Sequence, residues 1–446
     1  MPEDLRHVPV HRHLLLNTLT MMVGMMSMMG LGLLDTWFIS RLGTEALAAI
    51  SFTFPITFSL ISLMIGMGVG TSAVLGRVIG RGDILAARRL AVVALVCASF
   101  LMLLAALIGL LIAPWLFNVM GADAVTLPLI LQFMHLWFSA CVLLAVSMVG
   151  NAIFRAFGNA RIPSVIMVIA SLVNAALDPV LIFGWGPIPA MGLQGAALAS
   201  VVSWICGSAL MLWLLTYRYH FLDGRSWRKH IVANGRVLLQ IALPAALTNM
   251  LTPFATVLLT ALVAVFGREA VAAYGVGGRV ESIASLFILS LSMVLPPFIS
   301  QNLGAQRCDR IRQGYDAALR MVLIVQLVVA GVLFLLAPML ARWFSEQNQV
   351  QEAIVMYLSI LPLGYGAQGI IILTNSSFNA LHQPRQALGL SVLRFFGLLI
   401  PLSWLMAQWL QLKGIFVAGV LANVLCALLA YLWFNKVMKK MERHDS

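Results

Sequence analysis

Long apolar runs separated by short polar stretches dominate this chain. A helix needs about 20 residues to cross roughly 30 Å of hydrocarbon, and each run meets that length. Backbone groups have no water to bind in lipid, so uniformly apolar spans are predicted to be helices. Twelve helices are therefore expected, at approximately residues 14–39, 47–74, 90–113, 127–150, 162–183, 191–216, 237–264, 271–299, 319–341, 353–376, 387–410 and 414–435.

The order of residues repeats within the chain. The segment from Gly43 to Ala49 matches that from Gly267 to Ala273, an offset of 224 residues. Six helices per copy is an even number, so both copies enter the membrane in the same direction, as two parallel, pseudo-symmetric lobes. The same offset relates four further positions: Asn151, Phe154, Ala156 and Arg161 correspond to Asn375, Phe378, Ala380 and Arg385.

The repeat predicts three parts of the chain. Residues 1–217 form an N-terminal six-helix lobe, 218–236 a basic cytoplasmic linker, and 237–446 a C-terminal six-helix lobe. The fold class is thus an all-α membrane protein. Composition agrees, because 61% of the residues are hydrophobic and 10% are charged, against about 25% charged in soluble domains.

Positive charge has a clear pattern along the chain. The net charge is +12, but the basic residues cluster between apolar runs, so a nucleic-acid partner is not expected and the partner surface is the lipid bilayer. Both termini and the even-numbered loops carry 23 of the 28 Lys and Arg residues. By the positive-inside rule that side is cytoplasmic, which predicts a multi-pass protein of a bacterial inner membrane.

The chain carries no motif for enzyme chemistry. It has no GxSxG, P-loop or HExxH sequence, and its five cysteines show no CxxC spacing. We therefore expect no catalytic residues, no bound cofactor and no metal centre. Function is expected to depend on ionisable groups inside the bilayer, which are costly to place there.

Two acidic residues of the first lobe are expected at matching depth. Asp35 lies near the outer end of the first helix and Asp178 near that of the fifth. Asn174 and Asp178 are four residues apart and so share one helix face, while Pro179 leaves the Ala175 carbonyl without its helical donor. Two close carboxyl groups should not both ionise easily. These residues predict a site for a proton or Na⁺; a purely anchoring role for Asp35 stays open.

The second lobe carries a different polar pair. Arg279 and Glu281 are two apart on one helix, so they point to different sides and need other partners. A substrate contact and a structural ion pair remain equal alternatives. The 224-residue offset puts Leu259 at the place of Asp35, so the carboxyl pair belongs to the first lobe alone.

Three segments together resemble the multidrug and toxic compound extrusion (MATE) family, bacterial DinF-like branch. They are DTWFISRLGTEALAAISFTFP from Asp35 to Pro55, GRGD from Gly80 to Asp83, and NAALDP from Asn174 to Pro179. The resemblance implies two six-helix lobes forming a V-shaped cleft, and cation-driven export of bulky, often cationic and amphipathic drugs. It also implies that Asp35, Asn174 and Asp178 form the cation-coupling network.

Two departures from some relatives affect coupling. The first helix lacks a proline near its inner third, so it would have to bend at a glycine such as Gly30 or Gly32. A threonine expected on the sixth helix is missing, and the nearest hydroxyl belongs to Ser200. This favours H⁺ over Na⁺ as coupling ion. The expected protein is a monomeric antiporter; a lipid-linked precursor flippase of the same superfamily is the alternative.

Overall fold

A computed structural model describes residues 5–225 and 227–445. Residues 1–4, 226 and 446, which fall within the predicted lobes and linker, lie outside this described part. Across the described ranges the elements are helices, and the one β-bridge pairs Trp185 with Ile188. The described residues divide into two compact units, residues 20–246 without 226, and residues 5–19 with 247–445.

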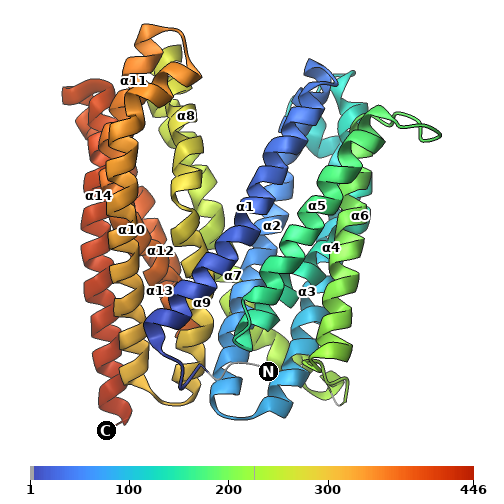
Figure 1. The fold of residues 1–446 in the computed structure, drawn as a ribbon, viewed down its shortest axis with the longest axis vertical. Coiled ribbons are helices and arrows are strands. Elements are labelled where there is room, and N and C mark those ends of the chain that lie inside the picture. The colour runs from blue at the N-terminus through green and yellow to red at the C-terminus, as the bar shows by residue number, and fades with distance from the viewer. Residues whose placement is uncertain (1–4, 226, 446) are drawn as a thin grey trace. The chain divides into compact units, whose positions relative to one another are not determined.

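The first unit is organised around one central helix. α4 packs against α2, α3 and α6, and α5 packs against α6 (Figure 1). Apolar side chains of α4 such as Phe138 and Phe154 are fully enclosed in the core. The helices are α1 (Val10–Ser40, from Thr20), α2 (Thr44–Gly80), α3 (Ile84–Val119), α4 (Thr126–Ala156), α5 (Arg161–Phe183), α6 (Leu193–Trp213), a π-helical turn η1 (Leu214–Arg218), and the beginning of α7 (Trp227–Ala264).

The second unit repeats this plan with α12 at its centre. α12 packs against α9, α10 and α14. The elements are the rest of α7, α8 (Arg268–Ala284), α9 (Leu286–Gly304), α10 (Cys308–Phe344), α11 (Asn348–Ile360), a 3₁₀ turn η2 (Leu361–Gly364), α12 (Tyr365–Ala380), α13 (Pro384–Val392), a π-helical segment η3 (Leu393–Leu399) and α14 (Ile400–Asp445).

Helix boundaries recur at the offset of the sequence repeat. α2 and α8 begin after Gly43 and Gly267, whose φ angles of 108° and 102° favour glycine. α3 begins at Ile84 and α10 at Cys308, while α4 ends at Ala156 and α12 at Ala380. Each of these pairs differs by 224 residues. The internal repeat is therefore present in the structure as well as in the sequence.

Most predicted spans exist, with longer ends. α3 begins at Ile84 rather than near residue 90, because Asp83 caps it by accepting from the Ala86 N–H at 2.9 Å. The predicted span 271–299 is broken at Ser285 into α8 and α9. Within the described residues, eleven helical segments are apolar and long enough to cross a membrane. The last, Pro384–Arg443, covers 60 residues and turns at Gln411, where φ is 52°, so it contains the final two spans.

The unit boundaries differ from the predicted lobe boundaries. Most of the predicted linker is helical, since α7 begins at Trp227, and its first part packs closely on α2. A Cβ atom on Gly70 would lie 2.9 Å from the Leu238 carbonyl oxygen, so glycine permits this contact. The spacing of Gly66 and Gly70 in α2 thus marks a helix contact.

Residues 5–19 belong with the second unit. The Leu5 N–H donates to Gln301 Oε1 at 3.2 Å, and Arg307 donates to the Arg6 carbonyl at 2.9 Å. Arg310 also donates to the Val8 carbonyl at 2.6 Å. This segment is held by side chains that follow it by about three hundred residues, as the 296-residue separation of Leu5 and Gln301 shows.

Candidate functional site

The structure brings the two acidic residues of the first unit together. Asp35, on α1, and Asp178, on α5, are neighbours whose carboxyl groups interact electrostatically. Asp178 is fully buried, and Asp35 is partly buried. An ionised carboxylate has no donor, so a proton on one of two neighbouring carboxyl groups would let them hydrogen-bond to each other.

Asn174 completes the arrangement on the same face of α5. With its amide oriented to satisfy both groups, it donates to Asp178 Oδ2 at 3.2 Å and accepts from the Ser200 N–H of α6 at 3.0 Å. Asn174 is 2% exposed, so it has little access to water. The amide thus fixes the Asp178 carboxyl relative to α6.

Each carboxyl group keeps a free acceptor. Asp35 Oδ1 and Asp178 Oδ1 are buried and have no hydrogen-bond partner among the described residues. Buried polar atoms without partners are costly, and they often mark sites where an ion or proton binds. The site can take up a proton, or offer oxygen ligands to a small cation.

Local sequence explains why α5 and α6 approach closely here. Pro179 lies inside α5 directly after Asp178 and cannot donate to the carbonyl four residues earlier. Gly195 of α6 faces the next turn of α5, where an added Cβ would lie 2.5 Å from the Leu181 carbonyl carbon and 2.8 Å from the Ile182 nitrogen. The missing side chain allows α6 to bring Ser200 to Asn174.

Glu281 of the second unit lies in a separate polar cluster. Its carboxylate accepts from the Tyr357 hydroxyl at 2.9 Å and from Gln368 Nε2 at 3.1 Å. Arg394, in η3, also interacts with it electrostatically and donates to Asn423 Oδ1 at 3.0 Å. α8, α11, α12 and the last helices are thereby joined around one carboxylate.

The predicted second-lobe pair is only partly reproduced. Arg279 is exposed on α8, and within the described part of the chain it forms no ion pair with Glu281 or another acid. As their two-residue spacing indicated, Arg279 and Glu281 do not pair directly; Glu281 accepts from Tyr357 and Gln368 and interacts electrostatically with Arg394. A substrate contact for either residue stays a prediction. Sequence reasoning missed Tyr357, Gln368 and Arg394. A usable signal existed, since Tyr357, Tyr365 and Gln368 interrupt an apolar span at helical spacing.

The two glycines proposed as bending points lie in an unbroken helix. α1 runs from Val10 to Ser40, and an added Cβ on Gly30 or Gly32 would meet no atom within 4 Å. Nothing packed against these positions would therefore obstruct a bend. A bend at Gly30 or Gly32 stays a prediction.

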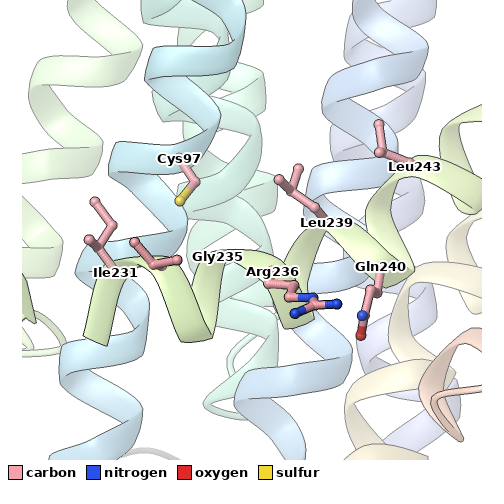
Figure 2. A pocket seen from close by; sticks show the side chains of 8 residues that line it. Cys97, Ile231, Gly235, Arg236, Leu239, Gln240 and Leu243 are labelled. Carbon is pink, nitrogen blue, oxygen red and sulfur yellow. The ribbon is translucent and has the colours of Figure 1, made fainter. Parts of the chain in front are cut away.

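An open groove on the first unit lies apart from these residues. It encloses about 460 Å³ between α3 and the beginning of α7, and Figure 2 shows Cys97 approaching Gly235 there. Arg236 and Gln240 are its polar lining, and neither Asp35 nor Asp178 contributes. This groove is not part of the carboxyl site.

Membrane-length apolar helices with buried carboxyl groups inside them are typical of membrane transporters. The MatE family model matches residues 20–180 and 244–405, again one copy per half. The chain belongs to the MatE family of transporters.

Relatives and solved structures agree over nearly the full length. An "FAD transporter" of Shewanella oneidensis is 38% identical over 97% of this chain and 96% of its own. The "Probable multidrug resistance protein YoeA" of Bacillus subtilis is 26% identical over 98% of this chain and 93% of its own. The Vibrio cholerae MATE transporter VcmN, solved in the bent form, superposes with a TM-score of 0.93 at 31% identity, over 97% of this chain and 98% of that one.

Proposed function

We propose that this protein is a secondary antiporter that exports bulky organic compounds and is driven by a cation bound at Asp35, Asn174 and Asp178. The observation that carries the proposal is the neighbouring carboxyl pair of α1 and α5, with a buried oxygen that lacks a hydrogen-bond partner on each side chain. A group that gains or loses charge inside the membrane couples ion movement to helix movement.

A proton is the coupling ion that the geometry favours. The two carboxyl groups are neighbours, and Ser200 contacts the amide of Asn174. Sodium would need several oxygen ligands converging on one point, and the described residues offer few besides the two acids. Proton release would leave two charges to be separated or hydrated, which gives α1 a reason to move.

Two substrate classes have specific support. Multidrug resistance is in the name of the Bacillus subtilis relative and multidrug export in the name of the Staphylococcus aureus relatives, at 24–26% identity. FAD transport is in the name of the Shewanella relative, at 38% identity. The diphosphate of FAD would require cationic partners, and the exposed Arg279 of α8 is one side chain that could serve. We therefore keep FAD as the second candidate substrate, after cationic amphipathic drugs.

The test uses proteoliposomes with an imposed gradient. Wild-type protein should concentrate its substrate when a proton gradient is applied and fail to do so with a sodium gradient alone. One charge crossing 100 mV supplies about 2.3 kcal/mol, which sustains roughly a 50-fold substrate gradient. A fluorescent organic cation and FAD, assayed in the same vesicles, separate the two substrate classes.

Variants make the coupling residues testable. Asp35→Asn and Asp178→Asn should each abolish gradient-driven accumulation, while Asp309→Asn should not, because Asp309 has an exposed side chain with 60% relative accessibility. Equal accumulation by wild type and well-folded Asp35→Asn would contradict the coupling role. The model of a cytoplasmic basic side further expects Lys436 and Arg307 to be reachable only from inside the cell.

A further inference from the structure

The second unit has a groove of its own between α13, η3 and the end of α14. Its volume is about 530 Å³. It is lined by apolar residues along one stretch and by polar residues at one end: Leu393, Leu429, Leu432, Trp433 and Val437, then Gln386, Lys436 and Lys440.

Two lysines stand at the polar end without acidic partners. Lys436 and Lys440 are four residues apart on α14, so they lie on one helix face, and both are exposed. No ion pair involves either lysine in the ranges that the structure describes; the nearby Glu442 pairs with Arg312 instead, at 3.7 Å. Two uncompensated ammonium groups on one face suit an anion such as a phosphate.

Gln386 contributes an acceptor that lacks a donor. Its side chain is part of the groove lining, and its Oε1 atom is buried with no hydrogen-bond partner among the described residues. Gln386 stands near the start of α13, which begins at Pro384, so its position is fixed by the helix. A ligand hydroxyl at this point would satisfy the carbonyl oxygen.

We propose that this groove binds an acidic glycerophospholipid whose headgroup carries a hydroxyl, such as phosphatidylglycerol. The phosphate lies between Lys436 and Lys440, a headgroup hydroxyl donates to Gln386, and an acyl chain runs along Leu429 and Leu432. Trp433 stands between the apolar and basic stretches, as indole rings do at the membrane interface. This site is separate from the proposed transport site.

The bound lipid would add to the existing packing of η3 on α14. Leu393 begins the π-helical segment η3, and the next residue, Arg394, donates to Asn423 of α14. A lipid in the groove adds a second connection between η3 and α14. Lipid binding should therefore raise the thermal stability of the protein as well as its lipid content.

The test is native mass spectrometry of the delipidated full-length protein titrated with phosphatidylglycerol or phosphatidylcholine. Phosphatidylglycerol should bind more tightly. Lys436→Gln/Lys440→Gln should weaken it roughly 30-fold, since each Lys near an anionic headgroup contributes about 1 kcal/mol and each tenfold is about 1.4 kcal/mol. Lys439→Gln is the matched control, because Lys439 is exposed on the same helix but does not line the groove.

A third variant tests the hydroxyl. Gln386→Leu should weaken phosphatidylglycerol but leave phosphatidic acid, which has no headgroup alcohol, unchanged. The proposal is overturned if Lys439→Gln weakens binding as much as the double variant, if phosphatidylcholine binds equally well, or if millimolar inorganic phosphate displaces the lipid. Unchanged thermal unfolding of the lipid-free variants shows that folding is intact, and transport activity is not needed for any of these readings.

Discussion

Two glycines on α6 both face α5, and the stability of the protein should respond oppositely to a methyl group added at each. At Gly195 the new Cβ would lie 2.5 Å from the Leu181 carbonyl carbon, and backbone atoms cannot swing away. At Gly207 the nearest atoms are Ala170 Cβ and Ser147 Oγ, both at 3.7 Å, which is ordinary van der Waals contact. Gly195→Ala and Gly207→Ala therefore form a matched pair.

The expected magnitudes follow from these distances. Replacing a helical glycine by alanine raises the free energy of unfolding by about 1 kcal/mol when nothing obstructs the methyl group. Forcing an extra carbon into a tight contact costs about 1–3 kcal/mol. Gly207→Ala should thus be neutral or stabilising, and Gly195→Ala destabilising by about 1–2 kcal/mol. For units of this size each kcal/mol corresponds to roughly 2–4 °C in Tm, so the two variants should differ by about 5 °C or more.

The assay is thermal unfolding of both variants in the same detergent, followed by proton-driven transport in vesicles. Gly195→Ala should also slow transport, because Leu181 is three residues from Asp178 and the displaced α5 would separate Asn174 from Ser200. If Gly195→Ala unfolds at the temperature of Gly207→Ala, the close approach of α5 and α6 is not as the structure has it. Wild-type transport with a lowered Tm would confine the role of Gly195 to stability.

Three further changes separate the other polar groups. Glu281→Gln should retain most of the proton-driven accumulation, since the proposed coupling residues Asp35 and Asp178 lie in the first unit; complete loss would move coupling to the second unit. Tyr357→Phe should lower the free energy of unfolding by about 2 kcal/mol, because it removes a hydrogen bond to the Glu281 carboxylate. Tyr315→Phe should lower it by roughly 1 kcal/mol, because Tyr315 bonds a neutral Thr374 hydroxyl at 2.7 Å. Asp223→Asn should lower Tm at neutral pH. The backbone N–H of Arg225 and then the Arg89 side chain, at 3.2 Å, lower the pKa of Asp223. The stabilising contribution of Asp223 is therefore lost as the pH falls through that lowered pKa, and the Tm difference from wild type should vanish in acid.

The helices and the repeat were predictable because their signals are local and redundant. Lipid requires long apolar runs, and one offset fixes several helix ends at once, as Gly43 and Gly267 show. The meeting of Asp35 with Asp178 was also accessible, because the two positions have equal depth and Asn174 shares the face of Asp178. Depth and helical phase are both readable from sequence.

The cluster around Glu281 was not predictable in the same way. Its partners come from α11, α12 and η3, and nothing in the spacing of residues 281, 357, 368 and 394 indicates which helices adjoin. Helix ends were also misplaced, because polar termini such as that capped by Asp83 extend beyond the apolar run. The grouping of residues 5–19 with the second unit depends on contacts across the chain and leaves no local pattern.

The attachment of residues 5–8 to α9 and α10 has a consequence for biosynthesis. Leu5 leaves the ribosome 296 residues ahead of Gln301, its hydrogen-bond partner. At 5–20 residues per second, this interval lasts roughly 15–60 s. During that time the segment has no binding surface, and closing so long a loop is entropically slow. Residues 5–8 therefore reach their final place only after α9 and α10 have been made, and a nascent chain halted before α9 would expose them to proteases.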